Sequence, residues 1–93
     1  MSVTVINNRR WRASYILADG TPAGAAWSSM RELAPADVAR TGATHFIAVP
    51  RHPTPPPRGG QVQYAGQIYD VLAVERSPES ADFRRVMVRR AAR

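Results

Sequence analysis

The chain has 93 residues, no cysteine, and thirteen basic against seven acidic residues, which give a formal net charge of +6. A chain of this length buries one modest core, and without cysteine it has neither a disulfide framework nor a thiolate metal site. No apolar run approaches the roughly 20 residues of a membrane helix, so we expect a single soluble domain over residues 1–93 without membrane contact.

The first quarter of the chain predicts two strands and a turn. Val3–Ile6 is mostly β-branched, and apolar residues recur with period two over residues 11–17, so both segments predict strands. Asp19-Gly20 is a pair that suits a tight turn. Pro22 and Gly24 follow, and we expect them to keep that segment out of regular structure.

Residues 27–33 are compatible with a third strand, although Met30 and Leu33 also fit helical spacing. The segment Pro35–Arg40 predicts one or two turns of helix, because a proline stands in its first turn and Gly42 follows its end.

Thr44–Val49 predicts a short strand, and the segment after it, residues 50–60, is dominated by proline. Closely spaced prolines favour an extended and semi-rigid polyproline conformation. Gly59-Gly60 at its end predicts a flexible joint. We therefore expect a stiff loop that projects from the sheet on a hinge.

A hairpin follows the loop. Val62 and Tyr64 alternate with glutamines, Ala65-Gly66 supplies a two-residue turn, and residues 67–75 return as a longer strand. Both faces of that returning strand carry apolar residues, so we expect both to be at least partly covered. The alternation predicts one face made of Tyr69, Val71 and Ala73, and an opposite face made of Ile68, Leu72 and Val74.

Residues 76–82 predict a polar turn, and Phe83–Val88 predicts the last strand, with Val86 and Val88 inward and Arg85 and Arg89 outward. Residues 89–93 predict a frayed basic tail. The expected fold is therefore mainly β: a small barrel or sandwich of five to six short antiparallel strands, with one short helix and a long proline-rich loop. Such a small sheet leaves edges open, and pairing of edges between copies in a ring would cover them.

Catalytic and metal-binding patterns are missing from the sequence. His45 and His52 lie seven positions apart with Pro50 between them, a spacing that suits neither a helical nor a strand-borne zinc pair. We therefore expect no enzyme activity, no cofactor and no metal.

The basic residues near the end of the chain predict a binding surface. Five arginines fall within ten residues, with no acidic residue among them: Arg84, Arg85, Arg89, Arg90 and Arg93. Such a field suits nucleic acid or an acidic protein surface. Tyr64 and Tyr69 could stack on bases, but packing in the core also explains their alternation, and we favour packing.

The order of the motifs resembles the head-closure proteins of tailed bacteriophages, also called head–tail joining, connector or stopper proteins. The likeness begins at a tryptophan followed by a hydrophobic residue and a leucine, and it continues through a "TH.I.V" strand, a long loop, a "G.V.Y.G..Y.V..V" hairpin and a closing strand with basic ends. These are Trp27, Met30, Leu33, Thr44, His45, Ile47, Val49, Gly60, Val62, Tyr64, Gly66, Tyr69, Val71, Val74 and "FRRVMVRR".

The resemblance implies a structural protein of the virion neck, made in the bacterial cytoplasm. Copies would form a ring, six- or twelve-fold in this family, that closes the DNA-filled head beneath the portal or adaptor ring. The ring would meet tail terminator or tail tube proteins and surround double-stranded DNA. Its long loop would seal or gate the channel; here that loop comprises Arg51, His52, Pro53, Pro55, Pro56, Pro57, Arg58, Gly59 and Gly60.

Two alternatives remain open from the sequence. One is another small virion or tail-assembly protein of similar β architecture, from a phage or a phage-derived particle such as a gene transfer agent. The other is a free nucleic-acid-binding module, whose affinity for DNA would fall steeply with salt.

Overall fold

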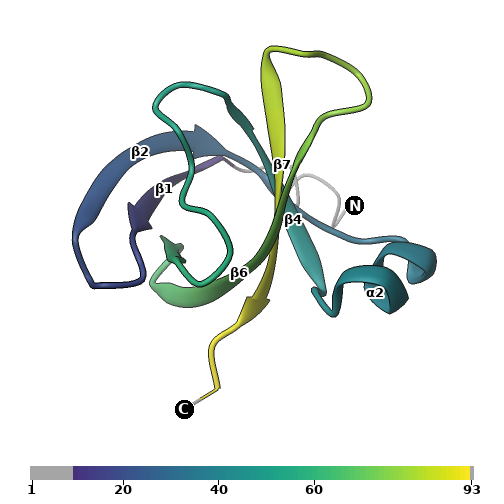
Figure 1. Ribbon diagram of the computed structural model, residues 1–93, viewed down its shortest axis with the longest axis horizontal. Coiled ribbons are helices and arrows are strands. Elements are labelled where there is room, and N and C mark those ends of the chain that lie inside the picture. The colour runs from purple at the N-terminus through teal and green to yellow at the C-terminus, as the bar shows by residue number, and fades with distance from the viewer. Residues whose placement is uncertain (1–9, 93) are drawn as a thin grey trace, which may run out of the picture.

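Seven antiparallel strands and one short helix make up residues 10–92, the part of the chain that the computed structural model describes. The strands form one sheet in the order β2-β1-β5-β6-β7-β4-β3, which curls into a half-barrel (Figure 1). The elements are β1 Trp11–Ile16, β2 Pro22–Ser28, β3 Met30–Glu32, α2 Pro35–Thr41, β4 His45–Pro50, β5 Gln61–Tyr64, β6 Gln67–Arg76 and β7 Phe83–Arg90. The predicted mainly β fold is confirmed.

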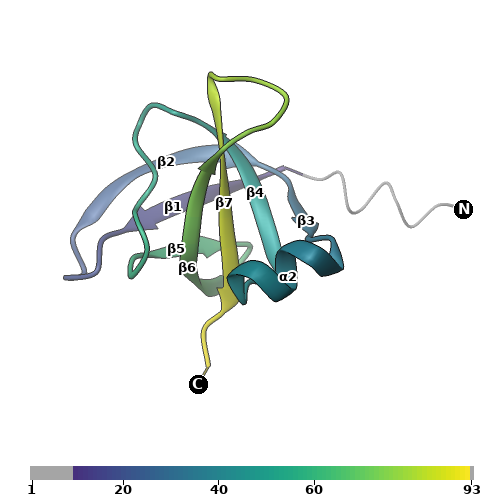
Figure 2. The same cartoon turned by 45° about the vertical axis from the view of Figure 1, so that its right-hand side comes forward.

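The half-barrel curls because its two edge strands are one bent stretch of chain. Only Ser29 separates β2 from β3, yet β2 pairs with β1 at one end of the sheet and β3 pairs with β4 at the other. The Ser28 hydroxyl donates to the carbonyl oxygen of Ala48 at 2.7 Å, and the Tyr64 hydroxyl donates to the carbonyl oxygen of Ser28 at 3.1 Å. The bond to Ala48 links β2 to β4 on the opposite side of the sheet, and the bond from Tyr64 links the same position to β5. Figure 2 shows β2 continuing across the molecule into β3.

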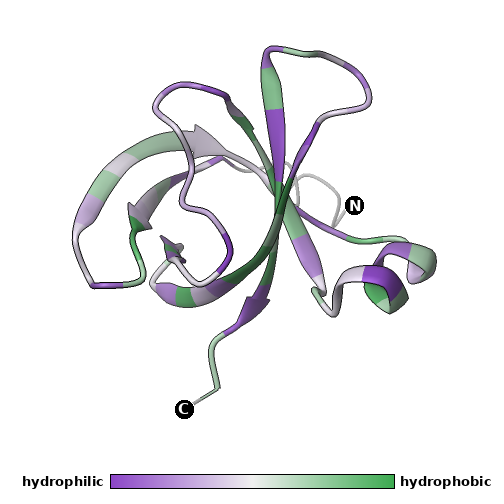
Figure 3. Ribbon diagram, in the orientation of Figure 1, coloured by the Kyte–Doolittle hydropathy of each residue, from purple (hydrophilic) through white to green (hydrophobic). Residues whose placement is uncertain are grey.

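Most of the hydrophobic core lies on the inner face of the curl. Its buried members are Ala13, Tyr15, Ile47, Val49, Val62, Tyr64, Val71, Val86 and Val88. A second and smaller cluster lies on the other face of the sheet, where Leu33, Ala43 and Met87 are buried. The inward orientation predicted for Val86 and Val88 is confirmed, since both are fully buried. Figure 3 shows hydrophilic residues where β7 leaves the sheet near its end.

A bulge in β6 changes which residues share a face. Val71 pairs with Val88, but the next pair joins Ala73 to Met87, so Leu72 is an extra residue in its strand. Val74 therefore packs in the same core cluster as Val71, whereas Leu72 and Ala73 both pack against the second cluster. The prediction that Ala73 shares a face with Val71, and Val74 with Leu72, is wrong because strict alternation fails at a bulge.

The first half of the chain differs most from the expectation. Pro22 begins β2, where a missing backbone donor costs little, and Gly24 adopts a φ of 116° beside a shift in the β1–β2 register. The prediction that Pro22 and Gly24 exclude regular structure is therefore wrong. The expected element over residues 27–33 is divided by Ser29 into the end of β2 and β3, so seven strands stand where five to six were expected. The predicted strand Val3–Ile6 lies outside the described residues.

The predicted helix is confirmed, one residue longer than expected. It spans Pro35–Thr41 and ends at Gly42, which adopts a φ of 78° and donates its backbone N–H to the carbonyl oxygen of Val38. The last strand also runs longer, to Arg90, so the expected tail over residues 89–93 begins inside β7.

Candidate partner-binding site at the loop 51–60

The loop 51–60 folds back onto the half-barrel. Pro55, Pro56 and Gly60 are buried. A Cβ placed on Gly60 would lie 2.6 Å from the Cβ of Pro56 and 2.8 Å from the carbonyl oxygen of Ile16, so the loop packs tightly against the end of β1. The prediction of a projecting loop is therefore wrong for its central part. The apolar rings of Pro55 and Pro56 gain from burial, which holds this part of the loop against the sheet.

The expected hinge at Gly59-Gly60 is also wrong, because the backbone there is fixed by hydrogen bonds. The Gly59 N–H donates to the carbonyl oxygen of Val71 at 3.2 Å, and the Val71 N–H donates to that of Gly60 at 3.0 Å. The Gly60 N–H donates to the carbonyl oxygen of Pro57 at 2.9 Å. The two glycines thus extend the contact between the loop and β6.

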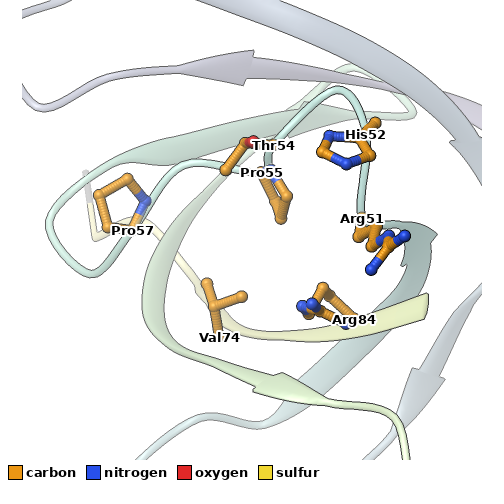
Figure 4. A pocket seen from close by; sticks show the side chains of 7 residues that line it. All are labelled: Arg51, His52, Thr54, Pro55, Pro57, Val74 and Arg84. Carbon is orange, nitrogen blue, oxygen red and sulfur yellow. The ribbon is translucent and has the colours of Figure 1, made fainter. Parts of the chain in front are cut away.

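A hollow of about 480 Å³ lies between the loop and the strands β6 and β7. Its lining is formed by Arg51, His52, Thr54, Pro55, Pro57, Val74 and Arg84. Figure 4 shows the basic side chains gathered at one end of this hollow and Pro57 and Val74 at the other. The loop thus forms one wall of this hollow.

Two arginines from distant parts of the sequence meet at this hollow. The Arg84 guanidinium donates from Nη1 to the carbonyl oxygens of Ala81 at 2.8 Å and Phe83 at 3.0 Å, which fixes its position. The Arg51 backbone N–H donates to the carbonyl oxygen of Asp82 at 3.0 Å and ties the loop to the turn before β7. Because β4 and β7 pair with Val49 opposite Arg84, the residue two places further along, Arg51, comes close to it.

The basic surface predicted near the chain end is divided rather than continuous. The Arg85 side chain makes contacts within the fold. Its Nη2 donates to the Asp37 carboxylate at 3.2 Å, and its Cζ lies 4.8 Å from the centroid of the Phe46 ring. Asp37 also accepts from Arg40, which in turn pairs with Glu75. The hydrogen bonds from Arg40 and then Arg85 lower the pKa of Asp37, and the bond from Arg40 lowers the pKa of Glu75.

Arg89 and Arg90 are exposed at the far end of β7, where they pair in register with Asp70 and Tyr69. Arg89 lies five positions after Arg84 in the strand, which is about 17 Å at roughly 3.3 Å per residue. The arginines near the chain end therefore lie in three separate environments: Arg84 lines the hollow, Arg85 contacts Asp37 and Phe46, and Arg89 and Arg90 are exposed at the far end of β7. Arg93 lies outside the described residues. The prediction of one basic surface is wrong, because strand geometry spreads neighbouring residues along the molecule and onto opposite faces.

The tyrosines proposed for base stacking serve the core. Tyr64 is 6% exposed and bonds to Ser28, while Tyr69 is half-buried against the main core cluster. Tyr15 is 1% exposed, and its burial raises the pKa of its hydroxyl to about 12. Neither Tyr15 nor Tyr64 presents a ring surface on which a base could stack.

Within residues 10–92, no group of three or more His, Cys, Asp or Glu side chains comes together that could hold a metal ion. None of the described helices is long and apolar enough to cross a membrane. The juxtaposition of Arg51 and Arg84 is the feature that sequence reasoning missed, since it depends on the pairing of β4 with β7.

No protein-family model, curated protein or solved structure matches the chain.

Proposed function

We propose that this chain is a structural subunit of the head–tail junction of a tailed phage or a phage-derived particle. In this role it forms a ring that closes the DNA-filled head and joins it to the tail. The proposal rests on the motif order in the sequence, and several residues of that motif are core residues of the fold. The motif residues Ile47, Val49, Val62 and Val71 all lie in the main core cluster, so they act as the framework of the half-barrel.

The structural observation that supports the proposal is the packed loop 51–60 with its basic hollow at one end of the half-barrel. A loop held by buried prolines and by backbone bonds to β6 is a preformed docking element. Preformed elements lose little conformational entropy when they bind a partner. This suits a subunit that joins neighbouring rings.

Exposed apolar side chains on other faces are compatible with contacts between copies. Trp27 is 61% exposed on the edge strand β2, and Phe83 is 41% exposed at the start of β7. β2 itself carries no charged residue, so it lacks the charge that commonly protects an edge strand. Contacts between copies in a ring would bury such surfaces.

Charge reversal on the loop tests the proposal more cleanly than deletion does, because deleting residues 53–57 would remove the buried Pro55 and Pro56. Arg51→Glu and Arg58→Glu change exposed side chains. In cells that assemble particles with the variant chain, we expect heads that lose DNA or remain without tails. Arg90→Glu, exposed at the far end of β7, is the matched control. Normal numbers of DNA-filled, tailed particles from both loop variants would contradict the proposal.

A free nucleic-acid-binding module is the second candidate, favoured by the exposed Arg89 and Arg90 on β7. Gel-shift titration against salt distinguishes it from a junction subunit. A free binder holds duplex DNA as a monomer, with an affinity that falls steeply as salt rises.

A further inference from the structure

The hollow beneath the loop 51–60 has a basic end and an apolar end. Arg51, His52 and Arg84 line the first, and Pro57 and Val74 line the second (Figure 4). No acidic side chain belongs to the described residues that line it. Its positive charge therefore has no compensating partner inside the hollow, which favours an anion from outside.

The two arginines are arranged for a bound anion. Arg84 uses Nη1 to bond the carbonyl oxygens of Ala81 and Phe83, while its Nε and Nη2 make no hydrogen bond to the described residues. The Arg51 side chain is exposed and also makes none among residues 10–92. A guanidinium presents a planar fork of donors that matches a carboxylate or a phosphate.

The apolar end of the hollow selects between these anions. A volume of about 480 Å³ lies in the range of ligand sites, roughly 300 to 1,000 Å³. A phosphate alone would leave Pro57 and Val74 facing water, and a DNA phosphate is flanked by polar sugar rather than by an apolar group. A carboxylate with an apolar group beside it would occupy both ends and remove apolar surface from water.

We infer that this hollow binds an acidic–apolar segment of a partner protein, with a carboxylate between Arg51 and Arg84 and an apolar side chain against Pro57 and Val74. The inference names the partner chemistry of the loop, and to that extent it rests on the proposed function. It assigns the loop to contact with protein rather than with DNA phosphate.

The test uses 4-phenylbutyrate as the probe, with 4-phenylbutyramide as its uncharged match, and follows backbone amide signals of the full chain by nuclear magnetic resonance. We expect the acid to shift the signals of Thr54, Val74 and Arg84 saturably. The amide should bind at least tenfold more weakly than the acid, which corresponds to a difference in binding free energy of about 1.4 kcal/mol. Inorganic phosphate should give no saturable shift of the Val74 signal.

Variants of the two arginines locate the carboxylate. Arg51→Gln and Arg84→Gln should each weaken binding of the acid by about tenfold. Because Arg84 also bonds the turn before β7, Arg51→Gln carries the test if the Arg84 variant fails to fold. Arg90→Gln is the control: Arg90 is exposed at the far end of β7 and does not line the hollow, so binding should not change.

Three outcomes would overturn the inference: equal binding of acid and amide, shifts confined to another surface, or undiminished binding by Arg51→Gln. A short DNA duplex that shifts the Thr54 and Val74 signals more strongly than the acid would assign the hollow to DNA instead. If the probe fails while loop variants still yield heads that lose DNA, the inference alone is lost. If the probe binds but those particles are normal, the proposed function is lost and the hollow stands.

Discussion

Adding a single methyl group at Gly60 tests whether the loop 51–60 is packed or projecting. The Cβ of Gly60→Ala would lie 2.6 Å from the Cβ of Pro56 and 2.8 Å from the carbonyl oxygen of Ile16. Both neighbours belong to a ring or a backbone and yield little. Overpacking of this kind costs about 1–3 kcal/mol, a large part of the roughly 5–15 kcal/mol that stabilises a small domain.

If the loop projected from the sheet, Gly60→Ala would raise the unfolding free energy instead of lowering it. Alanine in place of an unstrained, uncrowded glycine reduces the conformational freedom of the unfolded chain and stabilises a protein by about 0.4–1 kcal/mol. Gly60, unlike Gly59, does not adopt a positive φ, so backbone strain does not confuse the comparison. The sign of the change in unfolding free energy therefore separates the two descriptions of the loop.

Urea unfolding followed by tryptophan fluorescence measures that change, since the chain contains two tryptophans. The matched control is Pro56→Gly, which removes the closest atom. In that background Gly60→Ala should cost less than in the wild-type chain, with the remaining cost due to the carbonyl oxygen of Ile16. A Gly60→Ala variant as stable as the wild type, or more stable, would refute the packed loop.

Three further predictions concern the half-barrel. Tyr64→Phe removes the hydrogen bond to the carbonyl oxygen of Ser28 and should lower the unfolding free energy by about 0.5–1.5 kcal/mol in urea titration; an unchanged value would contradict this role. Met87→Ala empties a fully buried position and should cost about 2–5 kcal/mol by the same measurement; a loss below that range would show that the cavity collapses. The pKa of Asp37 is lowered from 3.8, chiefly by Arg40, so its contribution is present at neutral pH and is lost as the pH falls below 3.8 through the folded-state pKa. Thermal unfolding against pH should therefore show a smaller acid-induced loss in Asp37→Asn than in the wild type, and equal losses would contradict it.

Elements with strong local signals were predictable from the sequence. The hairpin Gln61–Tyr64 with its Ala65-Gly66 turn has the predicted bounds, and both turn residues adopt positive φ, 49° and 81°. The helix at Pro35–Thr41 follows from a first-turn proline and a closing glycine. In each case neighbours along the chain determine the conformation, so a single sequence was sufficient.

Elements set by distant contacts were not predictable in the same way. The loop 51–60 is held by Ile16 and Val71, which come from β1 and β6. The bulge at Leu72 depends on the match between β6 and β7. The hollow also needs the register of β4 against β7, which places Arg51 near Arg84. Local pattern indicates which residues are apolar or basic, but strand pairing decides which of them meet.

Electron microscopy of tailed particles that carry an affinity label on this chain tests the central claim most directly. The account predicts label at the junction of head and tail, with rotational symmetry in the averaged density. Particles that carry no label at that junction, or labelled chain found only free or on DNA outside particles, would contradict it.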